Sequence, residues 1–130
     1  MINSYTNTTL AVLTNGTLNF NNDSVKTGCT VTHSPGSTTF SLNKPGFYFV
    51  IFNGVGAATG DTVGSIVVQL QRNGVNVPGA LTSAASTTAL TDVESLSFST
   101  IIQVKPSCCA VDNNVNLTFV NTGIPTTFSN

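Results

Sequence analysis

Charged side chains are scarce in this sequence and make up 7% of its 130 residues, against about 25% in an average soluble domain. The permanent cations are Lys26, Lys44, Arg72 and Lys105, and the formal net charge is -1. They provide no basic patch that could follow a phosphate backbone, so we expect no nucleic-acid partner. So little charge also gives little repulsion between copies, which favours an oligomer over a neutral monomer.

Long hydrophobic runs are missing as well. No apolar run approaches the ~18 residues that a membrane-spanning helix needs, so we expect no membrane insertion. Polar residues follow Met1 closely, in place of the apolar stretch of a signal peptide. We therefore expect a chain that is made and kept in the cytosol, or a piece of something longer, folded as one domain over residues 1–130.

Metal-binding and disulfide-forming residues are few. The three cysteines, Cys29, Cys108 and Cys109, are an odd and sparse set, unlike the dense even pattern of a disulfide scaffold. Free buried thiols are the simplest expectation, and oxidation could join Cys29 to Cys108 or Cys109. One histidine, His33, and no CxxC pair do not supply the usual four zinc ligands, so we expect no metal and no cofactor.

Strong helix formers are nearly absent, and Ser, Thr and Asn supply the polarity that Glu, Lys and Arg supply elsewhere. Thr suits the pleated surface of a sheet, while Asn and Gly suit turns. No segment shows an apolar period of 3.6 residues. The sequence therefore predicts an all-β chain.

The strands centre on residues 42–79. Residues 47–52 are all apolar and follow Pro45-Gly46, which predicts a buried central strand. Residues 64–72 alternate, with Ile66, Val68 and Leu70 on one face. Asn73-Gly74 then predicts a tight hairpin turn, with a short return strand over 75–77 that Pro78-Gly79 ends.

The other segments give shorter or less regular strands. A hairpin is expected over residues 9–20 around Asn15-Gly16, and further strands over 29–33, 38–42, 95–105 and 115–120. Gly54, Gly56 and Gly60 are expected to loosen the chain after the central strand. Residues 80–92 show no clear period and predict a long surface loop, with room for a short strand inside it. The final strand is expected to be short or missing, since residues 126–130 could add only a stub.

About eight short strands at spacings near ten residues predict a two-sheet antiparallel sandwich, either a jelly roll or an immunoglobulin-like arrangement. An immunoglobulin domain normally buries a Trp between two core cysteines. This sequence contains no Trp.

Groups for catalysis are also sparse. His33 precedes Ser34-Pro35-Gly36, where a partly exposed turn histidine is expected rather than a catalytic base. Asp92 and Glu94 could hold Ca²⁺ or form a paired acid site, but a solvated loop end is the simpler interpretation. The glycines at 54, 56 and 60 lack the Lys-Ser/Thr ending of a phosphate-binding loop. We expect no enzyme.

Two motifs carry a resemblance to a known family: FSLNKPGFYFV at residues 40–50 and QLQRNGVNVPG at residues 69–79. In this order they resemble the tumour necrosis factor and complement globular-head jelly rolls. The likeness extends to the bacterial and phage branch, which includes spore-surface collagen-like glycoproteins and phage fibre proteins. It covers residues 10–123, and no collagen-like stalk precedes it.

The resemblance implies a homotrimer, with the interface at Phe47, Phe49, Phe52, Phe98 and Ile102. It implies a non-enzymatic bacteriophage virion protein, assembled in the host cytoplasm, that serves as a capsid decoration, head-fibre or tail-fibre module. Other virion proteins and host-surface glycans would be its partners. The alternative is the trimeric head of a bacterial spore-surface or adhesin glycoprotein.

Overall fold

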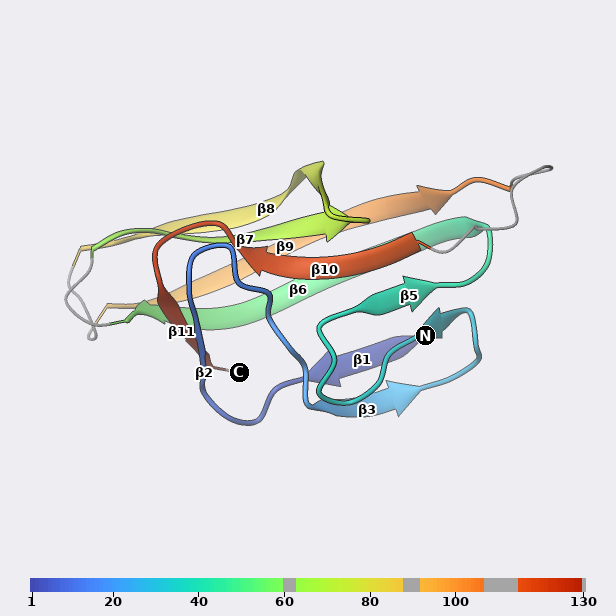
Figure 1. Ribbon diagram of the computed structural model, residues 1–130, viewed down its shortest axis with the longest axis horizontal. Coiled ribbons are helices and arrows are strands. Elements are labelled where there is room, and N and C mark those ends of the chain that lie inside the picture. Colours follow the sequence, from blue (N-terminus) through green and yellow to red (C-terminus); the bar gives the residue numbers. More distant parts are fainter. Residues whose placement is uncertain (60–62, 88–91, 107–114, 130) are drawn as a thin grey trace.

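The computed structural model describes residues 1–59, 63–87, 92–106 and 115–129. All regular secondary structure in these ranges consists of β-strands, which confirms the all-β prediction (Figure 1). The strands are β1 (Ile2–Tyr5), β2 (Leu10–Val12), β3 (Asn22–Lys26), β4 (Val31–Thr32), β5 (Phe40–Leu42), β6 (Gly46–Ala58), β7 (Gly64–Arg72), β8 (Val75–Ser86), β9 (Val93–Val104), β10 (Val115–Asn121) and β11 (Thr126–Ser129).

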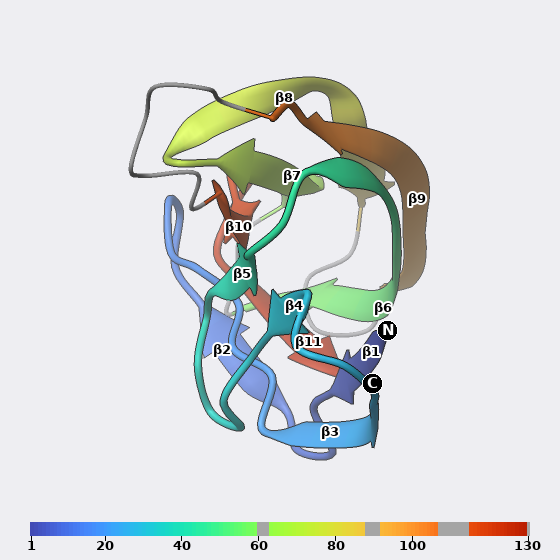
Figure 2. The ribbon, with the colours of Figure 1, turned by 90° about the vertical axis from the view of Figure 1, so that its right-hand side faces the viewer.

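Two larger sheets form a sandwich. The five-stranded sheet has the order β4-β5-β10-β7-β8, and the four-stranded sheet has the order β2-β11-β6-β9. A two-stranded ribbon, β1-β3, lies along one side, at the bottom of both Figure 1 and Figure 2. The sequence analysis predicted no strand in the ribbon, because residues 21–28, which contain β3, are polar and rich in residues that favour turns.

The strand pairs are nested in sequence order. β2 pairs with β11, β5 with β10, β6 with β9, and β7 with β8, all antiparallel. The chain thus pairs like one long hairpin whose successive pairs alternate between the two sheets. Its tip is Asn73-Gly74, where φ angles of 51° and 82° confirm the predicted tight turn.

Alternation places the core residues of β7 as predicted, and β9 alternates in the same way. Ile66, Val68 and Leu70 of β7 are fully buried, and Leu96 and Ile102 of β9 are nearly so. Burying one such side chain contributes roughly 1.5–3 kcal/mol. These inward rows from the two sheets make one continuous core.

The predicted burial of residues 47–52 on both faces does not hold within this chain. β6 alternates: Phe52 is 5% exposed, whereas Phe47 is 75% and Phe49 is 66% exposed. Gly54 and Gly56 do not loosen the chain either, since both lie inside β6. A Cβ on Gly56 would lie 3.0 Å from Thr126 Cγ2 and 3.3 Å from Phe128 Cδ1, so this glycine lets β11 pack closely. Gly60 lies outside the described residues.

The predicted hairpin over residues 9–20 is wrong, although its turn is present. Gly16 N donates to Leu13 O at 2.9 Å, but β2 then pairs with β11. After the turn, Leu18 N donates to Phe119 O at 2.8 Å, so the chain crosses to the other sheet. The crossing buries Leu18 between the sheets, which pairing with β2 would not.

The predicted loop over residues 80–92 is also wrong in its first half, because β8 continues to Ser86. The ladder with β7 shifts register between Gln69 and Gln71, which shows that Pro78-Gly79 is held in a bulge. The Gln69 amide is 5% exposed and donates to Val77 O at 3.0 Å and Ala80 O at 3.2 Å. These bonds satisfy carbonyls that the bulge leaves outside the ladder. Residues 88–91 lie outside the described ranges.

The final strand is short, as predicted, but its place in the sheet is filled. β11 pairs with β2 on one side and with residues 55–58 of β6 on the other. The same edge of β6 is open from Gly46 to Gly54, where no strand of the described residues pairs with β6 on that side.

One buried side-chain amide links the end of β10 to the end of β2 and to the segment before β11. Asn121 at the end of β10 is fully buried, and its Nδ2 donates to Val12 O at 3.0 Å and to Ile124 O at 2.9 Å. Its Oδ1 accepts from Gly123 N at 3.0 Å. Beside it, a Cβ on Gly123 would overlap the Ser65 carbonyl oxygen and approach Val67 N to 2.8 Å.

Replacing Asn121 with Ala should lower the free energy of unfolding by about 2–4 kcal/mol, because buried groups lose their partners. Urea unfolding of the purified protein measures this. Asn116→Ala removes an exposed amide from the same strand and should cost less than about 0.5 kcal/mol. Equal losses in the two variants would contradict this role for Asn121.

Candidate functional site

The five residues predicted at a trimer interface lie on two faces of the β6-β9 pair. Phe52 and Ile102 are buried, and Phe98 packs against the same core. Phe52 stacks on Phe98 with ring centroids 5.5 Å apart. Only Phe47 and Phe49 point outward, so within this chain Phe52, Phe98 and Ile102 stabilise the sandwich and present little surface to a partner.

The outward face carries further apolar residues that the sequence-based interface did not include. Ile51 is 58% and Ile101 64% exposed. The register places Phe49 opposite Ile101, so their side chains are neighbours on one surface. The full outward row of β6 and β9 contains no charged residue: Phe47, Phe49, Ile51, Asn53, Val55, Ala57, Val93, Ser95, Ser97, Ser99, Ile101 and Gln103.

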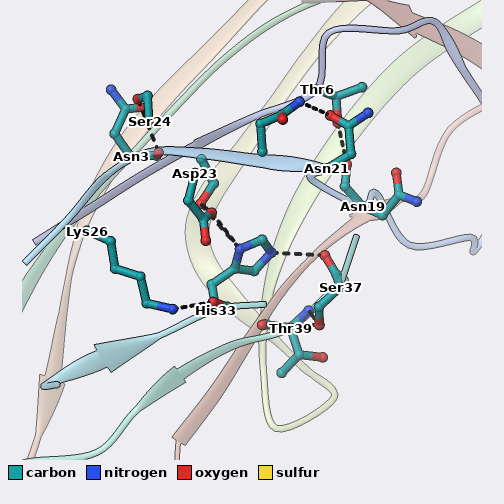
Figure 3. A network of polar contacts seen from close by, with 12 residues as sticks. Asn3, Thr6, Asn19, Asn21, Asp23, Ser24, Lys26, His33, Ser37 and Thr39 are labelled. Atoms are coloured by element: carbon teal, nitrogen blue, oxygen red, sulfur yellow. Dashed lines mark hydrogen bonds and ion pairs between the residues drawn. The ribbon is translucent and has the colours of Figure 1, made fainter. Parts of the chain in front are cut away.

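A polar network joins the β1-β3 ribbon to the sandwich. His33 is buried, contrary to the partly exposed histidine that was expected. Its Nδ1 lies 2.7 Å from Asp23 Oδ1 of β3, and its Nε2 lies 3.0 Å from Ser37 O. Figure 3 shows the ring between these two partners. Ser4 of β1 donates to Asp23 Oδ1 at 2.5 Å.

Both nitrogens of the His33 ring lie next to hydrogen-bond acceptors. An ionised Asp23 only accepts hydrogen bonds, as does a carbonyl, so a ring that donates from both nitrogens satisfies both partners. The ring also stacks on Phe40 with centroids 4.3 Å apart. Lys26 Nζ donates to His33 O at 2.9 Å and adds positive charge nearby.

Burial raises the pKa of Asp23, but the hydrogen bonds from Ser4 and His33 and the positive charges of His33 and Lys26 outweigh it. The pKa of Asp23 therefore lies below its ordinary value. The carboxylate holds the ribbon against His33 as one member of an ion pair. Its second oxygen, Oδ2, is buried without a partner among the described residues.

Ser4, His33 and Asp23 do not have the geometry of a catalytic triad. In a triad the serine and the aspartate face opposite nitrogens of the histidine. Here Ser4 Oγ, at 3.4 Å, and Asp23 both face Nδ1, and a backbone carbonyl occupies Nε2. The arrangement therefore connects elements and does not pass a proton from Ser4 through the ring. No motif in the sequence signals this network, because Ser4 and Asp23 precede His33 by 29 and 10 residues.

Asp92 and Glu94 do lie together, as their spacing suggested. Asp92 Oδ2 accepts from Thr87 N at 2.9 Å and Thr87 Oγ1 at 3.2 Å. A hydrogen bond with Asp92, its negative charge and slight desolvation raise the pKa of Glu94. The pair thus closes the β8-β9 connection at the end of the sandwich.

The remaining candidate ligands do not gather. Cys29 is an exposed free thiol, so the expectation of a buried one is wrong for this residue. Cys108 and Cys109 lie outside the described residues. Within the described ranges, no three His, Cys, Asp or Glu side chains are grouped to hold a metal ion. The same ranges contain no helix of the length and hydrophobicity that crossing a membrane requires.

Comparison of the sequence with models of known protein families finds no match, and comparison with curated proteins finds none either. The resemblance to the tumour necrosis factor and complement jelly rolls therefore stays a prediction.

The ion pair predicts acid sensitivity. Because the pKa of Asp23 is lowered in the folded state, its stabilising contribution is full above its ordinary pKa of about 3.9. The contribution is lost as the pH falls through the lower folded value. Urea unfolding between pH 7 and pH 3 (roughly the range of carboxylate titration) should show this loss in the unaltered protein and a smaller one in Asp23→Asn.

Glu94→Gln is the matched control, because the raised pKa of Glu94 has the opposite sign. This variant should keep the acid-induced loss. If Asp23→Asn has the same pH profile as the unaltered protein, the proposed stabilising role of the Asp23 carboxylate is wrong.

Proposed function

We propose that this chain is a non-enzymatic structural protein of a bacteriophage virion, a homotrimeric jelly-roll module of a capsid decoration, head fibre or tail fibre. The outward face of β6 and β9 carries this proposal. Five large apolar side chains stand exposed on it, and its outward row contains no charge. A surface of this kind loses little on leaving water, because no charged group has to be desolvated.

The size of the exposed apolar patch supports an interface. Phe47, Phe49, Ile51 and Ile101 are each more than half exposed. Taking roughly 150–200 Å² for each side chain gives a patch of about 400–500 Å². Patches of this size are among the largest on soluble monomers and are often functional.

The strand order supports the jelly roll. In a jelly roll a long antiparallel hairpin is rolled into two facing sheets, which gives nested pairs. The pairs β2-β11, β5-β10, β6-β9 and β7-β8 follow that scheme. The threefold symmetry and the virion location come from the resemblance of residues 40–50 and 69–79 to phage fibre proteins.

The trimeric head of a bacterial spore-surface or adhesin glycoprotein is the alternative, with the same fold and the same interface. A Gly-X-Y repeat encoded beside this domain would favour that alternative, whereas neighbouring capsid or portal genes would favour the virion. Both exclude catalysis. An enzymatic activity that disappears in His33→Ala while the fold is retained would contradict both.

Light scattering of the purified chain should give three times the chain mass of 13.4 kDa. The reason is that burying the β6-β9 face against two copies removes its apolar side chains from water. A monomer at micromolar concentration would exclude the proposed assembly.

Phe49→Asp should dissociate the trimer and leave the monomer folded. An unpaired carboxylate in an apolar interface costs several kcal/mol, which corresponds to at least about 100-fold weaker assembly. Val75→Asp is the matched control, since Val75 is 69% exposed but lies at the β7-β8 hairpin. Light scattering reports assembly and circular dichroism reports folding. A Phe49→Asp trimer of unchanged stability would show that this face is not the interface.

A further inference from the structure

The edge of β6 that pairs with β11 is open along most of its length. β11 pairs with it only from Val55 to Ala58, and its last residue, Ser129, lies opposite Val55. From Gly54 back to Gly46 no strand of the described residues continues this ladder, although β9 pairs with the same nine residues on the other side. The sheet therefore has room for one more strand, in line with β11 and antiparallel to β6.

The backbone along this edge has hydrogen-bonding groups without a strand partner. Thr59 N donates to Pro125 O, so the N–H of Thr59 points to the β11 side of β6. Backbone groups alternate between the two sides of a strand, so every second residue before Thr59 points to the same side. In the open stretch these edge-facing residues are Phe47, Phe49, Ile51 and Asn53.

The ladder with β9 gives the same orientation independently. Phe47 lies opposite Gln103. Gln103 O accepts from Arg72 Nη1 at 2.8 Å, so the backbone of Gln103 points away from β6. In an antiparallel pair, two opposite residues either bond to each other or both face away. Phe47 therefore faces away from β9, toward the open edge.

Proteins normally protect such an edge with a lysine, a proline or a bulge. The other long edge strands have protection of this kind: β8 contains the bulge at Pro78-Gly79, and Arg72 covers Gln103 O on the outer edge of β9. Residues 46–54 contain no charged residue and no proline, and their ladder with β9 has no register shift. An edge without protection is typical of a site that receives a strand.

A cavity of about 250 Å³ lies where β11 ends. The end of β11, residues 51–54 of β6 and residues 3–6 in and after β1 are among its lining, and no lining residue is charged. The β1-β3 ribbon therefore flanks this part of the edge but leaves a space beside it. One extended strand can enter that space, whereas a second sandwich, with sheets about 10 Å apart, would collide with the ribbon.

We propose that the open edge of β6 binds an extended, uncharged segment of another protein, which continues β11 as an added strand. The segment begins beside Ser129 and ends beside Gly46, since it runs antiparallel to β6. Its side chains alternate between the core side, next to Val50, and the outward face, next to Phe49. Both neighbourhoods are apolar, so a charged side chain would lose its hydration without gaining a partner.

The inference deepens the proposed function and rests on it for the origin of the segment, which in a virion is an arm of a neighbouring structural protein. The edge itself belongs to the single chain. Binding of a segment and formation of a trimer are therefore separate properties, and each can fail without the other.

The probe is a synthetic peptide with the sequence of residues 96–104, LSFSTIIQV, which already pairs with Gly46–Gly54 on the other side of β6. Lysines added at its C-terminus keep it soluble and lie beyond Gly46. Hydrogen exchange of the ¹⁵N-labelled protein is followed by NMR. The peptide should slow exchange of the edge-facing amides by at least about tenfold. The amides of Tyr48, Val50 and Phe52 point to β9 and should be unchanged.

Asn53→Pro tests the backbone of the edge. It removes an N–H that no strand of the described residues uses, a position where proline is tolerated, and should weaken peptide binding at least about tenfold. Asn53→Ala is the matched control, because it keeps the N–H and should keep the affinity. Circular dichroism reports the fold of both variants, and the exchange pattern of the unaltered protein decides if Asn53→Pro does not fold.

A peptide with aspartate in place of both serines tests the ligand class and should bind at least about tenfold more weakly. The inference is overturned if the edge-facing amides stay unprotected, if the two Asn53 variants bind equally, or if the aspartate peptide binds as well. Protection of these amides by raised protein concentration alone would also overturn it, because a second copy would then occupy the edge.

Light scattering on the same samples separates this inference from the proposed function. A trimer that binds no peptide removes this inference alone, and a monomer that binds the peptide removes the trimer alone.

Discussion

The ladder between β6 and β9 is the constraint on which the rest of the molecule depends. It pairs Gly46 with Val104 and continues without a register shift to Ala57 and Val93. Because side chains alternate along both strands, this one ladder supplies an inward row to the core and an outward row to the surface. The two rows differ in consequence: Phe52 stabilises the fold of a single chain, whereas Phe49 lies exposed in that chain.

Closure of the sandwich depends on a few groups between the sheets. Asn121 donates to the backbone at the end of β2 and before β11. Gly56 and Gly123 allow close approach, because a Cβ would be crowded at Gly56 and would overlap the backbone at Gly123. Gln69 performs a similar task at the β8 bulge. A core of almost uncharged strands therefore gains its specific alignment from buried amides, whose hydrogen bonds are lost if the register slips.

The β1-β3 ribbon depends on a different interaction, the pairing of Asp23 with His33. The pair attaches two short strands that could not be stable alone, and it places β1 across from the open edge of β6. The neutral cavity lies between them, at the margin of the outward face, since Ile51 belongs to both. Attachment of the ribbon, the cavity beside it and the proposed trimer interface are thus adjacent features of one side of the sandwich.

By itself the sequence determined the strand class, the alternation in β7 and β9 and the Asn73-Gly74 turn, because these follow from local propensity and a period of two residues. Only the tertiary structure decided which strands pair: β2 joins β11 rather than residues 17–20, and β8 continues through Pro78-Gly79 with help from Gln69. The five residues predicted at an interface divide between the inward and outward faces, since hydrophobicity does not tell which face of 47–52 points inward. Neither the His33 network nor the cavity could be predicted, because each assembles residues that are distant in sequence and adjacent only after the sheets close.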